Sequence, residues 1–280
     1  MSCSELARLA GVPLAGTASR AERWLVLEHR APWGRDAVEG SGLSPELVAG
    51  LSAFDGRVLL VRRPGRPNGP PAAFVGVTTA GGGRLRRLEV ERPEDVLRVD
   101  VDADGDPVGG TLLLVCTHAR RDVCCATHGV PAYNALRRHV PDGRLWRSSH
   151  QGGHRFAANV LALPSGIQLG RVEAGAAAEV AEALAAGRIP LRFYRGRTLY
   201  AREVQAADAA VRARLGLDRV SDVRLFAHDG SRVVLDTSRG AVEVTVAERD
   251  GPVLPPSCGR DAEPTPILEA TVHGLDVAPG

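Results

Sequence analysis

The chain has 280 residues, 44% of them hydrophobic, which is enough for a large core without disulfides or a structural metal. It has 35 basic residues, all of them arginine, and 33 acidic residues, so the net charge is +2. This balance excludes a nucleic-acid-binding protein that relies on uncompensated basic charge. We expect a soluble cytoplasmic chain without membrane contact, because its apolar runs are broken by charges, glycines and prolines and its N-terminus does not resemble a signal peptide.

The first region, residues 1–107, is predicted to be α/β. A helix should begin after the cap Ser44 and run to about Ala53. The triple glycine 81–83 predicts a hairpin turn, since neither a helix nor the Lys and Ser/Thr of a phosphate loop follows it. Asp100–Gly110 lacks the glutamate that closes an EF-hand loop and is interpreted as a polar linker. The predicted strands are 24–28, 57–61, 73–77 and 84–90.

The second region, residues 108–195, has the element order of a thioredoxin-like unit. It begins with Thr111–Cys116, a continuous apolar run that predicts a buried strand. Helices are expected at 121–128 and 131–139, interrupted by Gly129. A strand at 144–148, a hairpin of 157–163 with 167–172, and a helix at 173–186 should follow.

The third region, residues 196–280, is predicted to be a small α+β unit. An amphipathic helix is expected at 201–215, with strands near 223–227, 232–236, 241–247 and 267–273. The predicted fold class is therefore α/β, or α+β overall. A thioredoxin-like ferredoxin domain is expected between an N-terminal α/β region and a C-terminal α+β region.

The five cysteines are unevenly placed. Cys3 and Cys258 stand alone, whereas Cys116, Cys124 and Cys125 lie within ten residues. In a reducing compartment such a cluster is more often metal-binding or redox-active than part of a disulfide framework. We therefore expect the chemistry of the chain at this cluster, and we assign no role to Cys258.

Two histidines complete a four-ligand set with two of these cysteines. Structural zinc favours cysteines two to four residues apart, but eight residues separate Cys116 from Cys125. A diiron cluster is larger than one ion, so a longer loop and a helix can surround it. This spacing suits Cys116 and Cys125 on one iron and His150 and His154 on the other.

The residues around these ligands have expected supporting roles. Gly152 and Gly153 lie between the two histidines and would let the backbone turn sharply toward a bulky cofactor. Arg120, Arg121, Arg147 and Arg155 would stabilise thiolates or form a solvated rim where a partner docks. The histidines at 118, 128 and 139 are interpreted as ordinary helix or loop residues.

Three motifs carry a family resemblance. They are Cys116-x-His118-x-x-Arg121-Asp122-x-x-Cys125, then Ser149-His150-Gln-Gly-Gly-His154-Arg-Phe-Ala157, then Leu163-Pro-Ser-Gly166. Residues 10 to 195 resemble the sucrase/ferredoxin-like family, whose members are similar to thioredoxin-like ferredoxins with a [2Fe-2S] cluster on two cysteines and two histidines.

The resemblance implies a ligand set and its surroundings. The ligands would be Cys116, Cys125, His150 and His154, and Cys124 would be an extra thiol. Nearby cofactor-binding residues would be Arg121, Asp122, Gly152, Gly153 and Arg155. No pair of carboxylates stands in a glycosidase-like context, so we expect no sucrase activity.

The predicted function is electron transfer to or from a redox partner protein or a small molecule, and whether the chain is an enzyme is left open. Imidazole ligands in place of thiolates raise the potential toward the Rieske range of about −150 to +300 mV and couple reduction to proton uptake. Two alternatives remain: a zinc-binding structural or regulatory protein with the same four ligands, and a thiol oxidoreductase using Cys124 and Cys125. A cysteine-based phosphatase is excluded because Asp122 stands where its arginine should be.

Overall fold

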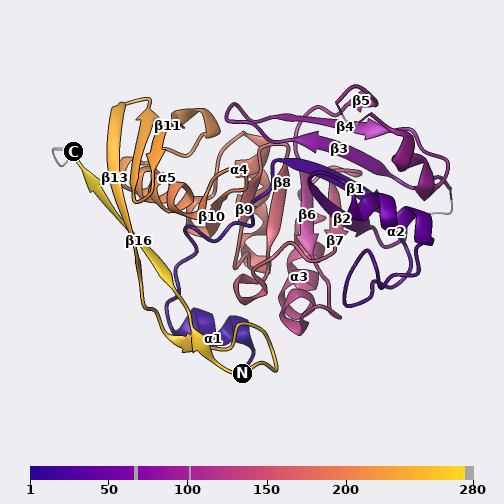
Figure 1. Ribbon diagram of the computed structural model, residues 1–280, viewed down its shortest axis with the longest axis horizontal. Coiled ribbons are helices and arrows are strands. Elements are labelled where there is room, and N and C mark those ends of the chain that lie inside the picture. The colour runs from indigo at the N-terminus through magenta and orange to yellow at the C-terminus, as the bar shows by residue number, and fades with distance from the viewer. Residues whose placement is uncertain (66–68, 101, 275–280) are drawn as a thin grey trace.

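The computed structural model describes residues 1–65, 69–100 and 102–274, and within these ranges most strands belong to one large sheet (Figure 1). Its strands in chain order are β1 (Arg23–Glu28), β2 (Arg57–Arg62), β3 (Ala73–Val77), β4 (Arg84–Leu88), β5 (Asp106–Pro107), β6 (Leu112–Cys116), β7 (Leu145–Ser148), β8 (Val160–Leu163), β9 (Ile167–Leu169) and β10 (Tyr194–Arg197). Across the sheet they lie in the order β10-β9-β8-β6-β7-β2-β1-β3-β4-β5.

A second sheet lies at the C-terminal end of the chain. It has the order β11-β12-β13-β16 and consists of β11 (Val223–Asp229), β12 (Arg232–Thr237), β13 (Gly240–Arg249) and β16 (Ile267–His273). A short ribbon of β14 (Val253–Leu254) and β15 (Glu263–Pro264) interrupts the connection from β13 to β16. The mixed α and β composition confirms the predicted fold class.

The described residues also form five α-helices and several short 3-10 helices. The α-helices are α1 (Cys3–Leu9), α2 (Pro45–Ser52), α3 (Val123–Leu136), α4 (Ala177–Ala185) and α5 (Arg202–Leu215). The 3-10 helices are η1 (Pro93–Arg98), η2 (His154–Phe156), η3 (Ala174–Ala176), η4 (Leu191–Phe193) and η5 (Val220–Asp222). No described helix has the length and apolar character needed to cross a bilayer.

The unit that carries the cysteine cluster has the expected strand, helix, strand, hairpin and helix order. Strand β6 is parallel to β7, and α3 is the crossover between them. On the other side β6 pairs with β8 in the antiparallel sense, and β8 continues into β9. Because β6 and β7 are parallel, their carboxyl ends Cys116 and Ser148 lie side by side at one edge of the sheet.

The large sheet continues from this unit into the N-terminal region. Strand β2 pairs with β7, with Val61 opposite Ser148. Residues 1–107 and 108–195 therefore share one sheet. The division of the chain into three domains, at residues 107 and 195, stays a prediction. The predicted linker Asp100–Gly110 contributes the two-residue edge strand β5, and its Val101 lies outside the described residues.

Each face of the large sheet is covered by a separate part of the core. Leu113 and Val115 of β6 pack with residues of α3 and α4, and Leu60 of β2 packs with α2. On the opposite face the rings of Phe74 and Trp146 meet edge to face at 6.1 Å, although β2 and β1 lie between their strands. The sheet is thus curled around this second face.

The helix after β6 corrects one expectation. Two helices interrupted at Gly129 were predicted, but α3 is continuous from Val123 to Leu136 and contains both Gly129 and Pro131. A Cβ atom on Gly129 would overlap the carbonyl oxygen of Cys116. This glycine allows close packing of α3 on β6, and a single proline removes only one backbone donor from the helix.

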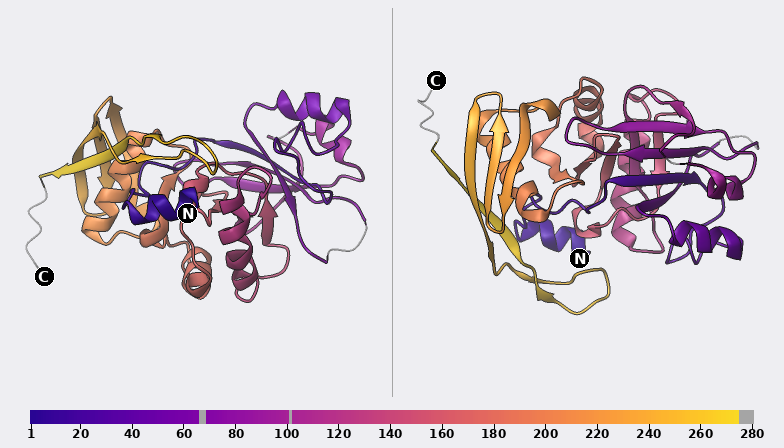
Figure 2. Two further views of the ribbon diagram at one scale, coloured as in Figure 1. Left: turned by 90° about the horizontal axis from the view of Figure 1, so that it is seen from below. Right: turned by 45° about the horizontal axis from the view of Figure 1, so that its top comes forward.

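The chain ends meet in a part of the fold that sequence patterns did not indicate. Helix α1, capped by Ser2 through a capping box with Glu5, was not predicted, and neither was β10. Figures 1 and 2 show the segment between β13 and β16 extending away from its own sheet as far as α1. Segments from both ends of the chain therefore lie beside η2 and the start of α3.

Candidate metal centre

The candidate site lies at the carboxyl ends of the parallel strands β6 and β7. Cys116 is the last residue of β6, Cys125 lies in the first turn of α3, and His150 follows β7 two residues after Ser148. Loops at the carboxyl ends of parallel strands converge on one edge of the sheet, which is where α/β folds usually place their ligands. The topology therefore joins residues separated by up to 34 positions along the chain.

Three of the four predicted ligands converge. Nδ1 of His150 lies 3.6 Å from Sγ of Cys125 and 4.0 Å from Sγ of Cys116, and all three atoms lie within 4.8 Å of one another. Both cysteines are buried, whereas His150 is half-buried. Two sulfurs and an imidazole nitrogen at these distances can bind a soft or borderline metal.

The fourth predicted ligand, His154, lies beside this group. Its ring centre is 5.5 Å from that of His150. Its Nε2 donates a hydrogen bond to the carbonyl oxygen of Pro256 at 2.5 Å, which leaves Nδ1 of the neutral ring as an acceptor. Nδ1 is buried without a hydrogen-bond partner and lies 3.3 Å from a carboxylate oxygen of Asp122. The unpartnered Nδ1 is thus the ring nitrogen available to a metal.

The protonation states suit metal binding. A hydrogen bond from the Cys125 thiol holds the pKa of Cys116 well below its usual value, despite burial, and the same contact together with burial raises the pKa of Cys125. Burial also lowers the pKa of His154, although Asp122 opposes this shift. A thiolate and a neutral imidazole are the forms that bind metals.

The loop between the histidines depends on glycine for its conformation. Gly152 and Gly153 have φ angles of 89° and 68°, in the left-handed region that other residues rarely adopt. A Cβ atom on Gly152 would collide with the side chain of Ser19, and one on Gly153 would lie 2.8 Å from Cζ of Arg195. The predicted sharp turn is present, and it is packed from behind by buried side chains.

Two arginines that sequence analysis did not single out, the half-buried Arg57 and the fully buried Arg195, hold this loop in place. Arg57 donates to the carbonyl oxygen of His150 at 3.2 Å, and Arg195 donates to that of Gly152 at 3.2 Å. Burial lowers the pKa of both guanidinium groups, that of Arg195 to about 9, while the Cys116 thiolate opposes the shift. No sequence pattern indicated Arg195, because its strand β10 also contains Arg197 and was not predicted.

His118 also has a positioning role. It was interpreted as an ordinary histidine, but it is buried between two polypeptide segments. Its Nε2 lies 2.6 Å from the carbonyl oxygen of Gly34, and its Nδ1 accepts a hydrogen bond of 3.2 Å from the backbone N–H of His150. His118 thereby fixes the backbone of a candidate ligand without joining the ligand group.

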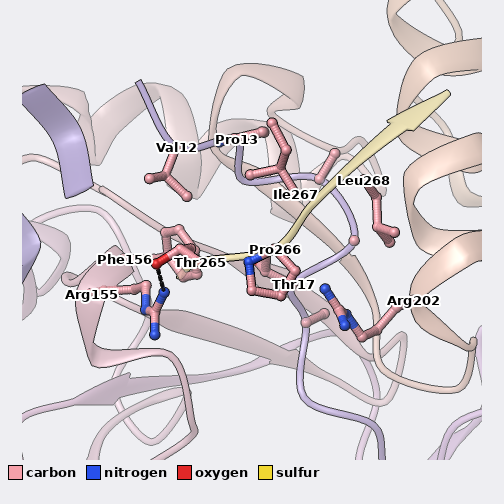
Figure 3. Close-up of a pocket in the computed structure, with 13 residues that line it drawn as sticks. Val12, Pro13, Thr17, Arg155, Phe156, Arg202, Thr265, Pro266, Ile267 and Leu268 are labelled. Carbon is pink, nitrogen blue, oxygen red and sulfur yellow. Dashed lines mark hydrogen bonds between the residues drawn. The ribbon is translucent and has the colours of Figure 1, made fainter. Parts of the chain in front are cut away.

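The other predicted cofactor-binding residues, Arg121, Asp122 and Arg155, lie in three different surroundings. Arg121 is exposed on the loop before α3, whereas Asp122 is buried and caps the helix by accepting from the backbone N–H of Cys124 at 2.9 Å. Arg155 donates to Oγ1 of Thr265 at 3.1 Å. This contact lies in a separate pocket, which Arg202 also lines (Figure 3). The pocket has a volume of about 260 Å³.

Cys124 belongs to a different group from its neighbour Cys125. Its Sγ lies 3.5 Å from Sγ of Cys3 and 3.3 Å from Sγ of Cys258. Hydrogen bonds from the Cys3 thiol and from Ser4 lower the pKa of Cys124 to about 5, despite its burial. The two adjacent cysteines therefore contact different partners, which speaks against a thiol redox pair formed by Cys124 with Cys125.

Comparison with known proteins agrees with the family resemblance of the cysteine and histidine motifs. The sequence model of the family described as "Sucrase/ferredoxin-like" matches residues 14–196, which include all three convergent ligands and His154. A curated protein named "Altered inheritance of mitochondria protein 32", from the yeast Meyerozyma guilliermondii, is 28% identical over 87 residues. The match covers 28% of this chain and 30% of that protein, so the chain spans under a third of its relative. No solved structure matched the chain.

Proposed function

Because this chain belongs to the sucrase/ferredoxin-like family, we propose that it holds a [2Fe-2S] cluster on Cys116, Cys125, His150 and His154 and transfers electrons. The convergence of two buried thiols with Nδ1 of His150 is the observation that carries the proposal. The unpartnered Nδ1 of His154, four residues after His150, supplies a fourth donor atom. The donor set therefore fits the chemistry of the cluster.

When bound, a [2Fe-2S] cluster supplies reversible one-electron transfer at a potential set by its ligands and surroundings. The surrounding residues prepare the site for it. Arg57 and Arg195 fix the carbonyl groups of His150 and Gly152, and their two positive charges favour a thiolate at Cys116. His154 keeps its ring proton on Nε2, hydrogen-bonded to Pro256, which fixes the tautomer of a histidine that ligates through Nδ1.

Electron exchange requires that part of the site approach the surface. His150 is half-buried, whereas Cys116 and Cys125 are fully enclosed, so an electron would enter or leave on the histidine side. Arg120 and Arg121 are exposed on the loop between β6 and α3. We propose that a redox partner of acidic surface docks at this edge, in the cytoplasm.

Adjacent cysteines provide a matched test of the ligand set. Cys125→Ser should remove the visible absorption and nearly all of the iron and sulfide, because it deletes a donor atom. Cys124→Ser should retain about two irons and two sulfides per chain. Purified proteins are compared by visible spectroscopy and by iron and sulfide analysis. Loss of iron in both variants, or in neither, contradicts the proposed ligands.

The metal content of the unmodified protein separates this proposal from a zinc protein with the same ligands. Three donor atoms within 4.8 Å of one another also suit a single ion, which is the observation in favour of zinc. A colourless protein that carries zinc on Cys116, Cys125 and His150, and takes up no iron and sulfide on reconstitution, would establish the zinc alternative.

The histidine ligands predict a potential that depends on pH. Each ligating imidazole keeps a proton on Nε2, and that proton is held more tightly when the site carries an added electron. The reduction potential should therefore fall as pH rises through the alkaline range. Redox titrations from about pH 6 to pH 10 test this, and a constant potential contradicts imidazole ligation.

A further inference from the structure

Three thiols from distant parts of the chain meet outside the site described above. Cys3 lies in α1, Cys124 in the first turn of α3 and Cys258 between β14 and β15. Their sulfurs form a nearly equilateral triangle, with distances of 3.3 Å, 3.5 Å and 3.6 Å. No disulfide bond joins them in this structure, since such a bond requires about 2.05 Å. The three cysteines are free thiols facing a common point.

A buried carboxylate adjoins this triangle. Oδ2 of Asp122 lies 4.0 Å from Sγ of Cys3, and the three sulfurs and this carboxylate all lie within 4.8 Å of one another. Backbone N–H groups of Cys258 and Cys124 donate to its two oxygens at 3.0 Å and 2.9 Å. The side chain of Asp122 is only 1% exposed.

The negative charge of this carboxylate has no arginine to balance it. Among the residues that the structure describes, the only side chain within ion-pair distance of Asp122 is His154, at 3.3 Å. A buried carboxylate is stabilised by a cation beside it. The thiol triangle occupies the adjacent space.

We propose that Cys3, Cys124, Cys258 and Asp122 form a structural zinc site. Zinc accepts thiolate and carboxylate ligands in closed tetrahedral sets of four. A tetrahedral ion about 2.3 Å from each sulfur holds the sulfurs about 3.8 Å apart, so the observed triangle needs to expand by only a few tenths of an ångström. Binding releases to solvent the protons that the thiols still carry.

The zinc site has a clear structural role. It joins the two ends of the chain to α3, because Cys3 and Cys258 are 255 positions apart and Cys124 lies between them. Pro256, which fixes the tautomer of His154, is two residues from Cys258. Zinc at the thiol triangle would therefore hold the C-terminal segment against His154 and exclude water from that side of the first site.

The zinc site shares no ligand with the proposed [2Fe-2S] site, so either proposal can fail alone. The test measures zinc and iron in three forms of the full-length chain, grown with both metals: unmodified protein, Cys3→Ser/Cys258→Ser, and Cys116→Ser/Cys125→Ser. The first double variant should lose about one zinc per chain and keep its visible absorption. The second should keep that zinc and lose its iron. Zinc unchanged in the Cys3/Cys258 variant overturns the proposal.

A direct measurement covers the case in which the Cys3→Ser/Cys258→Ser variant folds poorly. Metal-free Cys116→Ser/Cys125→Ser protein, which retains only the triangle thiols, is titrated with Co²⁺ as a spectroscopic substitute for zinc. One equivalent should give thiolate-to-cobalt charge-transfer bands and the visible bands of tetrahedral cobalt, and Zn²⁺ should abolish them.

Thiol labelling and mass measurement complete the test. Bound Zn²⁺ should protect Cys3, Cys124 and Cys258 from alkylation, and a chelator should expose them. Absence of cobalt bands, or equal labelling with and without Zn²⁺, overturns the proposal. The mass of the protein is also measured without a reducing agent. A mass lower by two hydrogens than that of the free-thiol form, with a Cys124–Cys258 cross-link, also overturns the proposal, because the triangle would then be a disulfide site.

Discussion

The turn between His150 and His154 depends on contacts made by its backbone. Arg57 and Arg195 bind two of its carbonyl groups, and Arg195 also donates to Oδ1 of Asn159 at 2.8 Å. The loop has no room for side chains on its glycines, since buried groups already fill the space behind it. The positions of the two histidines therefore follow from residues that would not themselves bind a metal.

Substitution of Gly153 tests this at the scale of a single residue. Gly153→Ala should lower the free energy of unfolding by roughly 2 kcal/mol or more, because its φ of 68° is unfavourable for alanine and its Cβ would press on Arg195. It should also lower the iron content, since the loop must shift. Urea denaturation and iron analysis provide the measurements.

Gly187 offers a matched control for this substitution. It has the same φ of 68° but open space around its Cβ position. Gly187→Ala should cost only about 1 kcal/mol and leave the iron content unchanged. Equal effects at the two positions would mean that the packing of Arg195 against the loop contributes nothing.

At the scale of the element, α3 connects the two candidate metal sites. Asp122 caps its first turn, Cys124 faces the thiol triangle and Cys125 faces Cys116. Consecutive helical residues project about 100° apart, so two neighbouring cysteines can serve two separate sites. The distance of α3 from β6 matters because it sets how closely Cys125 approaches Cys116.

Gly129 determines this distance, and a substitution tests it. Gly129→Ala should destabilise the protein by about 1 to 3 kcal/mol, although alanine favours helices more than glycine does, because the new methyl group would overlap the carbonyl of Cys116. Thr127→Ala, at an exposed position of the same helix, should change stability by about 0.5 kcal/mol or less. Unfolding measurements that show Gly129→Ala to be neutral or stabilising contradict close packing of α3 on β6.

At the scale of the whole molecule, α5 holds the two large sheets together. It packs against β10 of the ten-stranded sheet and against β13 and β16 of the four-stranded sheet. A buried polar network lies at its centre. Asp208 accepts from the hydroxyl of Tyr194 at 2.6 Å and from Nε of Arg212 at 3.0 Å, and both members of the ion pair are at most 1% exposed.

Breaking this pair should destabilise the junction of the two sheets. Asp208→Asn leaves the buried charge of Arg212 uncompensated and should cost about 3 to 5 kcal/mol in unfolding free energy. Glu243→Gln removes one charge of an exposed pair with Arg232 in the four-stranded sheet and should leave the stability almost unchanged, because solvent screens this pair. Chemical denaturation of both variants measures the difference, and similar small losses would show that the buried network adds little.

Local patterns predicted most elements of the fold, because buried positions recur along a helix or strand as a regular spacing of apolar residues. The apolar run ending at Cys116, the helix cap at Ser44 and the alternation near Val233 each correspond to an element in the structure. The apparent break at Gly129 was wrong, because a glycine needed for close packing looks like one that ends a helix. Helix α1 is too short and strand β10 too rich in arginine to give such a pattern.

The sequence predicted the four donors from the spacing of two cysteines and two histidines, and the family model matches the segment that contains them. The tertiary structure determines which of these donors meet. It brings Cys116 and Cys125 to His150, leaves Nδ1 of His154 facing Asp122, and joins Cys124 to thiols from the two ends of the chain. These contacts join residues from separate elements of the chain, so they depend on strand order and helix packing, which no local pattern records.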